Sequence, residues 1–213
     1  MADGQIGLFD AIYSQRAVRS LRPDPVPEEY LTRIIEAATK APSGGNSQPW
    51  AFVVINERET IGKLAVFVQD AFAPMYDSAL ANANPNDPPP YGRLKGLVDA
   101  FDQVPAVILA CYVGREGVER HPREGLSSVY PAVQNLLLAA RGLGLGATLT
   151  GLAINHANGK YKGDVKALLG IPEHVEPLVL IPIGYPDKER YGSTTRKPVA
   201  EVTHWNSWGD QRE

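Results

Sequence analysis

The sequence predicts an α+β fold in a single domain, residues 1–213. Several stretches carry apolar residues at helical spacing. Three short runs, at 50–55, 104–113 and 175–183, are mostly apolar and rich in β-branched residues, which is typical of strands buried on both faces. A chain of 213 residues buries roughly 70% of the surface of its unfolded form, so it can support a core without disulfides or metals.

Two helices are predicted before the first strand. The first covers residues 8–13, and a proline-rich run at 22–27 separates it from the second. The second helix begins near Pro27, because proline suits the first turn of a helix, and Pro42 ends it. The apolar face of this second helix consists of Leu31, Ile34, Ile35 and Ala38.

A third helix is predicted over 57–69, followed by an irregular segment at 70–98. Three consecutive prolines at 88–90 cannot continue a helix or a central strand. A long irregular segment inside a compact domain is more often functional than a plain connection. We therefore expect 70–98 to be an active-site flap.

The longest helical pattern, 126–143, is apolar over most of its circumference, which places it at the domain centre or against another subunit. The glycines of 142–146 precede a predicted strand at 147–154, so they are expected to cap the helix and not to bind a dinucleotide. A short helix is predicted at 164–169. Residues 186–213 are polar, aromatic and irregular, and are predicted to form a C-terminal arm.

The charge balance and hydropathy exclude several classes of protein. Lys plus Arg number 21 against 24 Asp plus Glu, a net charge of -3, and the basic residues are scattered, so no nucleic-acid partner is expected. No run approaches the ~20 apolar residues of a membrane span, so no membrane partner is expected. The N-terminus lacks a signal-peptide pattern, and we expect a cytoplasmic protein.

Common catalytic motifs are also missing. The histidines at 121, 156, 174 and 204 show no metal-ligand spacing, so no metal is expected. Cys111 lies in a predicted strand and is expected to be a buried, inert thiol. The sequence contains no G-x-S-x-G motif of the serine hydrolases.

Four short motifs have a composition suited to ligand binding. They are Q-R-A-V-R at 15–19, A-P-S-G-G-N-S-Q-P-W at 41–50, A-T-L-T-G at 147–151 and T-T-R-K-P at 194–198. Glycines let a backbone approach a ligand, and Asn and Gln amides can pair with the edge of a heterocycle. Taken singly, the first motif also fits a solvated basic helix end, and the second fits an ordinary turn.

In order and spacing, these motifs resemble the nitroreductase superfamily of FMN-dependent oxidoreductases, over nearly the whole chain. The segment P-S-x-x-N-x-Q-P-W, from Pro42 to Trp50, is the most specific match, and the helix from Gln134 to Gly146 and the arm motifs G-Y-P, R-x-P and H-W-N-x-W are also similar. Gln15 and Ala17 replace the first arginine and the serine of the family's R-R-S-x-R.

The resemblance implies a mixed sheet flanked by helices, assembled as an intertwined homodimer with two FMN molecules at its interface. It implies an FMN site formed by Arg16, Ala17, Arg19, Pro42, Ser43, Asn46, Gln48, Thr148, Thr150, Gly151, Arg196 and Lys197.

Each part of the flavin makes its own physical demand on this set. The phosphate needs guanidinium donors, for which Arg16 and Arg196 are expected, with Lys197 or backbone amides in place of the missing arginine and serine. Arg19 is expected beside N1 and O2, where negative charge develops. The other polar residues face the ring: Asn46 and Gln48 at the pyrimidine edge, and Thr148, Thr150 or the Gly151 backbone near N5.

The flap is expected to cover the exposed ring face. Its candidate substrate contacts are Phe72, Met75, Tyr76, Tyr91 and Arg93, and local packing explains each of them equally well. No protein acid or base is required, because the flavin carries the hydride.

The implied reaction is ping-pong: NAD(P)H delivers hydride to FMN, and a small electron-poor acceptor, a nitroaromatic or quinone, then takes it. Two alternatives remain open. One is a specialised flavin enzyme on the same scaffold, of the dehalogenase, flavin-fragmenting or dehydrogenase type, and the other is a non-catalytic flavin-binding protein.

Overall fold

The computed structural model describes residues 6–84, 87–114, 122–155, 159–188 and 194–212. Its centre is a four-stranded sheet in the order β1-β2-β4-β3, formed by Trp50–Ile55, Ala106–Val113, Val175–Gly184 and Gly146–Ala147. All pairs of these strands are antiparallel, and an isolated bridge between Ala17 and Ala147 adds a parallel pairing. The predicted α+β class is confirmed.

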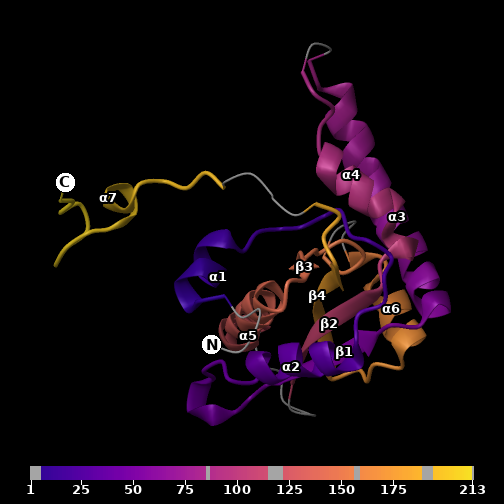
Figure 1. The fold of residues 1–213 in the computed structure, drawn as a ribbon, viewed down its shortest axis with the longest axis horizontal. Helices are drawn as coiled ribbons and strands as arrows, with labels where there is room; N and C mark the ends of the chain where they lie inside the picture. Colours follow the sequence, from indigo (N-terminus) through magenta and orange to yellow (C-terminus); the bar gives the residue numbers. More distant parts are fainter. Residues whose placement is uncertain (1–5, 85–86, 115–121, 156–158, 189–193, 213) are drawn as a thin grey trace.

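Helices cover both faces of the sheet (Figure 1). Helices α2 (Glu28–Ala38) and α5 (Pro122–Gly142) pack on one face, and α3 (Arg58–Ala81), α4 (Gly92–Asp99) and α6 (Lys162–Leu169) pack on the other. Successive side chains of a strand point to opposite faces, so Ile108 of β2 belongs to the first core and Leu109 to the second. Both side chains are fully buried.

The shorter elements lie around this three-layer body. Helix α1 (Leu8–Ser14) packs against α5, and two 3-10 turns, η1 (Gly44–Asn46) and η2 (Phe101–Gln103), precede β1 and β2. A four-residue helix, α7 (Val199–Val202), lies in the C-terminal arm.

Two of the predicted strands differ from expectation. Strand β1 occupies the predicted residues but lies at the edge of the sheet, so most of its side chains are only half-buried within one chain. The predicted strand at 147–154 is reduced to β3 and an isolated bridge between Thr150 and Leu180, because the chain turns at 151–155.

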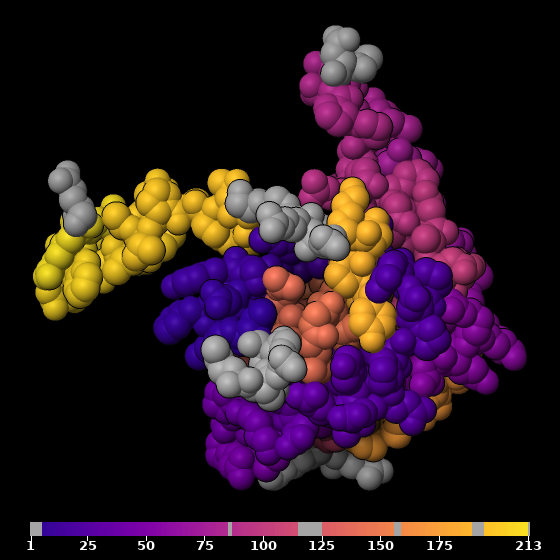
Figure 2. Space-filling model, viewed as in Figure 1, coloured from indigo at the N-terminus to yellow at the C-terminus, as the bar shows by residue number. Residues whose placement is uncertain are grey.

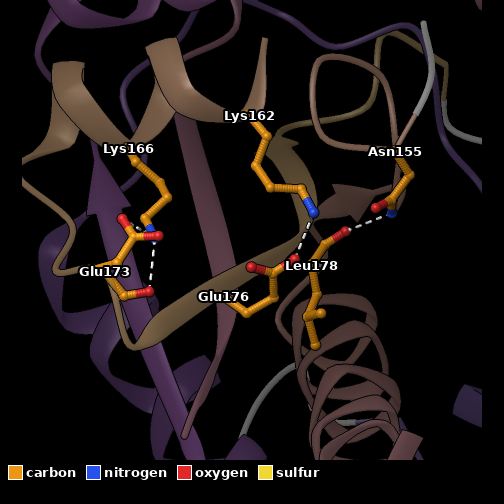
Figure 3. A network of polar contacts seen from close by, with 6 residues as sticks. All are labelled: Asn155, Lys162, Lys166, Glu173, Glu176 and Leu178. Atoms are coloured by element: carbon orange, nitrogen blue, oxygen red, sulfur yellow. Dashed lines mark hydrogen bonds and ion pairs between the residues drawn. The ribbon is translucent and has the colours of Figure 1, made fainter. Parts of the chain in front are cut away.

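Strand β4 bulges opposite Ala110 and Cys111, where Leu178 is the extra residue. Figure 3 shows how side chains brace this part of β4: Asn155 Nδ2 donates a hydrogen bond to the Leu178 carbonyl oxygen at 3.0 Å, and Lys162 of α6 pairs with Glu176. The Asn155 bond ties the 151–155 turn to the sheet.

The prediction of an irregular segment at 70–98 is wrong in its secondary structure. Helix α3 continues through Pro74 to Ala81, and α4 forms beyond it, so the two helices make a long hairpin that projects from the body (Figure 1). An internal proline costs a helix about 3 kcal/mol. Contacts of Phe72 and Met75 with the core that includes Leu97 of α4 offset this cost.

The predicted C-terminal arm extends away from the body and forms a separate lobe in Figure 2. Several of its apolar side chains are exposed: Val199, Val202, Trp205 and Trp208, the last at 90%. Helix α1 also exposes apolar side chains, Leu8, Phe9, Ile12 and Tyr13. Exposed apolar surface of this extent is typical of protein interfaces.

Candidate functional site

A cavity of about 200 Å³ opens between the ends of α1 and α5, the segment after α1, and the chain that leaves β4. Three of its lining residues are cationic, Arg16, Arg141 and Lys188, and the part of the chain that the structure describes contributes no carboxylate to its lining. The remaining lining residues are Ser14, Gln15, Val18, Leu137, Leu145, Ala147 and Pro186.

One wall is the extended segment that follows α1. The Val18 N–H donates to the Ala147 carbonyl oxygen at 3.1 Å, and this bond holds the segment against β3. The contact is close: a Cβ at Gly146 would lie 2.6 Å from Val18 Cγ1. Gly146 is therefore required where the two backbones approach each other. Gly144, with φ of 77°, ends α5 as the sequence predicts.

The same segment then pairs with the chain after β4. The Ser20 hydroxyl donates to Asp187 Oδ2 at 2.6 Å, and the Asp187 N–H donates to the Ser20 carbonyl oxygen at 3.2 Å. The Arg22 N–H donates to the Tyr185 carbonyl oxygen at 2.8 Å. These bonds bring Lys188, which is 172 positions beyond Arg16, to the same cavity.

The extended backbone separates the two arginines of the Q-R-A-V-R motif. Gln15, Arg16 and Val18 line the cavity, whereas Ala17 and Arg19 are not among its described lining residues. Arg16 Nε donates at 3.2 Å to the carbonyl oxygen of Ser14, which is the last residue of α1. Arg16 therefore also satisfies the end of that helix, as the simpler interpretation of the motif suggests.

Arg141 and Lys188 are cavity residues that sequence reasoning missed. Arg141 lies in the last turn of α5, where a basic residue is ordinary, and no local pattern distinguishes it. Its Nε donates to the Ser14 hydroxyl at 2.9 Å, a contact across 127 positions of sequence.

The 42–48 loop forms a second cluster of predicted residues, outside the described lining of the cavity. The Gln48 N–H donates to the Ser43 hydroxyl at 3.0 Å. Asn46 and Gln48 both have left-handed backbone, with φ of 53° and 46°, and both are exposed. Left-handed backbone at non-glycine residues costs about 1–3 kcal/mol and concentrates at functional sites. Pro42, also exposed, leads into the loop.

Thr148 and Thr150 are buried, at 3% and 7% exposure. The Thr150 hydroxyl accepts the Leu152 N–H at 3.2 Å, so it stabilises the turn that follows. The Asn155 N–H donates to the Gly151 carbonyl oxygen at 2.7 Å. This turn leaves Gly151 half-exposed, so its backbone is the more accessible group of this motif.

Arg196 and Lys197 lie in the arm, exposed and outside the described lining of the cavity, and Arg196 Nη1 donates to the neighbouring Thr195 carbonyl oxygen. The predicted meeting of Arg16 with Arg196 is therefore not formed within one chain. It remains a prediction that requires the arm of a second copy.

The predicted substrate residues gather on the α3–α4 hairpin. The Phe72 and Tyr76 rings lie 5.5 Å apart, and Tyr91 meets Phe72 edge-on at 6.3 Å. Phe72 is 3% exposed, which favours local packing for that residue, whereas Tyr91 and Arg93 are exposed.

Cys111 is fully buried in β2, and burial raises the pKa of its thiol to about 11. Among the described residues, no group of three or more His, Cys, Asp or Glu side chains could hold a metal ion, and His121 and His156 lie outside them. Within the same ranges, no helix combines the length and apolar character that a membrane span needs.

Residues 12–185 match the Nitroreductase family. The chain belongs to this family. A protein of Methanothermobacter thermautotrophicus named as an NADH dehydrogenase/NAD(P)H nitroreductase is 32% identical over 86% of this chain and 81% of its own. An NADH dehydrogenase of Thermus thermophilus is 30% identical over 92% and 94%.

Among solved structures, an iodotyrosine deiodinase bound to FMN and 3-iodo-L-tyrosine has the same fold. It superposes with a TM-score of 0.71, at 24% identity, over 95% of this chain and all of that one. The comparisons confirm the resemblance, and membership of the Nitroreductase family supports an oxidoreductase.

Proposed function

We propose that this nitroreductase-family protein is an FMN-dependent oxidoreductase that passes hydride from NAD(P)H to an electron-poor acceptor, a nitroaromatic or a quinone. The proposal depends on one observation: three cations line the cavity, and none of its described lining residues is a carboxylate. The cavity lies at the motif where the family resemblance puts the flavin phosphate. FMN, when bound, supplies the acceptance and donation of hydride. The protein's residues bind and orient it.

The donor set fits the phosphate end of FMN. A phosphate carries close to two negative charges, and guanidinium groups match its oxygens in pairs. The cavity volume of about 200 Å³ lies below the roughly 300–1,000 Å³ of sites that enclose a whole ligand of this size. The cavity of one chain therefore suits only part of the flavin, and we propose that the ring lies outside it, between two copies.

Residues around the ring have roles in this proposal that follow from their chemistry. Arg19 would supply positive charge to the N1 and O2 edge of bound FMN and would stabilise the electron-rich ring. The side-chain amides of Asn46 and Gln48 would pair with the pyrimidine edge of bound FMN. The Gly151 backbone would hydrogen-bond N5 of bound FMN. We assign no side chain as an acid or a base, because the flavin carries the hydride.

A homodimer follows from the same proposal. The arm contributes no described residue to either core, yet it exposes Trp205 and Trp208 together with Arg196 and Lys197. If the arm lies on a second copy, its apolar side chains leave water and its cations reach that copy's flavin. The α3–α4 hairpin, with Tyr91 and Arg93, would then cover the acceptor.

The test is anaerobic titration of the purified full chain. We expect a yellow protein with a flavin absorbance spectrum that NADH or NADPH, added separately, bleaches, and a nitroaromatic or quinone restores. Parallel lines in double-reciprocal plots would support the ping-pong order. A colourless protein that takes up no added FMN would contradict the proposal, and flavin that neither nucleotide reduces would favour a specialised or non-catalytic flavoprotein.

Reductive dehalogenation is a second candidate, because the solved iodotyrosine deiodinase shares the fold over nearly all of both chains. The two candidates differ in the acceptor. Iodide released from 3-iodo-L-tyrosine by the dithionite-reduced protein, with no turnover of nitroaromatics, would favour the deiodinase.

A further inference from the structure

We infer that Arg141, oriented by Ser14, is a phosphate-binding residue of the cofactor site, through which this protein would bind FMN more tightly than riboflavin. The inference rests on the proposed function and adds to it a residue that lies outside the four sequence motifs. Its basis is the polar arrangement around Ser14.

Ser14 holds two arginines of the cavity at once. Its carbonyl oxygen accepts from Arg16 Nε at 3.2 Å, and its hydroxyl accepts from Arg141 Nε at 2.9 Å. The same hydroxyl donates to the Asp10 carbonyl oxygen, so its single proton is already engaged and it can only accept from Arg141. One serine thereby sets the positions of two guanidinium groups that come from distant parts of the chain.

Arg141 contacts Ser14 through Nε, so its two terminal nitrogens form the edge that would bind a phosphate. The bond to Ser14 engages Nε, and a guanidinium is planar, so fixing Nε also fixes the direction of the two terminal NH2 groups. Such a paired edge matches two phosphate oxygens, whereas the ammonium of Lys188 acts as a single point charge. Both arginines are half-buried, which weakens screening by solvent.

Helix ends oppose anion binding at this place. Helices α1 and α5 both terminate at the cavity, and each C-terminus carries about half a negative charge. Among the lining residues that the structure describes, three full positive charges outweigh the two helix ends, and removal of Arg141 lowers this sum by one charge. A purely structural Arg141 would only cap α5, and the two roles predict different measurements.

The experiment compares FMN with riboflavin, which has the same ring and ribityl chain but no phosphate. Dissociation constants of both flavins are measured on the full chain by fluorescence titration, for the wild type, Arg141→Gln and the control Arg33→Gln, an exposed arginine of α2. We expect Arg141→Gln to weaken FMN binding about 10- to 100-fold, the loss of one or two charge-assisted hydrogen bonds. Riboflavin binding stays within about twofold, because only the phosphate contact is lost.

Two further variants and a melting curve separate positioning from folding. Ser14→Ala keeps both charges and removes the orienting bond, so it weakens FMN binding by several-fold and leaves riboflavin unchanged, even if Arg141→Gln does not fold. Arg141→Lys keeps the charge without the fork and recovers part of the loss. The melting temperature of each variant without flavin measures any capping role.

Equal loss for both flavins, or no loss for FMN, overturns the inference while leaving the proposed function intact. A wild-type chain that binds neither flavin overturns the proposed function, and the inference with it.

Discussion

Adding one carbon atom at Gly146 is expected to displace the segment that carries Arg16. The Cβ of Gly146→Ala would lie 2.6 Å from Val18 Cγ1 and 2.9 Å from Val18 Cβ. Carbon atoms in contact are normally 3.5–4.0 Å apart, so Val18 must retreat by about 1 Å. Overpacking of this kind costs about 1–3 kcal/mol. For a chain of 213 residues this lowers the melting temperature by about 2–12 °C.

The displacement also weakens the bond from the Val18 N–H to the Ala147 carbonyl oxygen, and with it the position of Arg16. We therefore expect weaker FMN binding together with the lower melting temperature, measured by flavin titration and by thermal unfolding followed by circular dichroism. Gly142→Ala is the matched control: its Cβ meets nothing within 4 Å, and alanine in a helix is about 0.5–1 kcal/mol better than glycine.

A second substitution tests the cause. Val18→Ala in the Gly146→Ala background removes the 2.6 Å contact and leaves the one at 2.9 Å, so stability and FMN binding recover only in part. Wild-type stability and wild-type FMN affinity in Gly146→Ala would refute the close approach of β3 and the 16–19 segment as the basis of the cavity.

Three further predictions concern other parts of the molecule. Burial raises the pKa of Cys111 to about 11, so between pH 9 and 11 the native chain keeps a proton that the unfolded chain loses, and the free energy of unfolding falls as the pH rises. Urea titrations of the wild type and Cys111→Ala over this range test the prediction. An equal pH dependence of the unfolding free energy in the two proteins would contradict it. Gln48→Gly relieves the left-handed backbone, so stability stays within about 1 kcal/mol while FMN affinity falls about 2- to 10-fold; unchanged affinity would remove the Gln48 amide from the site. A chain ending at residue 193 is expected to keep its circular dichroism spectrum, because the arm adds no described residue to the cores, but to sediment as a monomer with weak FMN binding. A dimer with full FMN affinity would exclude the arm from the interface. Arg196→Ala in the full chain measures the contribution of that guanidinium alone to FMN affinity.

Local patterns predicted most of the body correctly. The strands at 50–55, 104–113 and 175–183 and the helix at 164–169 lie within about two residues of their predicted bounds. These elements are recognisable because a buried strand or helix face requires apolar residues at a characteristic spacing along the sequence. The P-S-x-x-N-x-Q-P-W segment likewise led to the family, because its residues are contiguous.

The α3–α4 hairpin shows where local patterns failed. Pro74 is a helix-breaking residue by propensity, and the run of prolines near 88–90 strengthens that impression. The helix persists because Phe72 and Met75 pack against residues of α4 and the second core. Tertiary burial decided this element against its local sequence.

By itself, then, the sequence determined the fold class, three of the four strands, several of the helices and the family, all through residues that are neighbours along the chain. Only the tertiary structure decided that Arg141 and Lys188 join Arg16 at one cavity, that Ser14 orients two guanidinium groups, and that Gly146 must lack a side chain. Contacts across more than a hundred positions depend on how the sheet and helices pack, and no local period or motif indicates which distant residues meet.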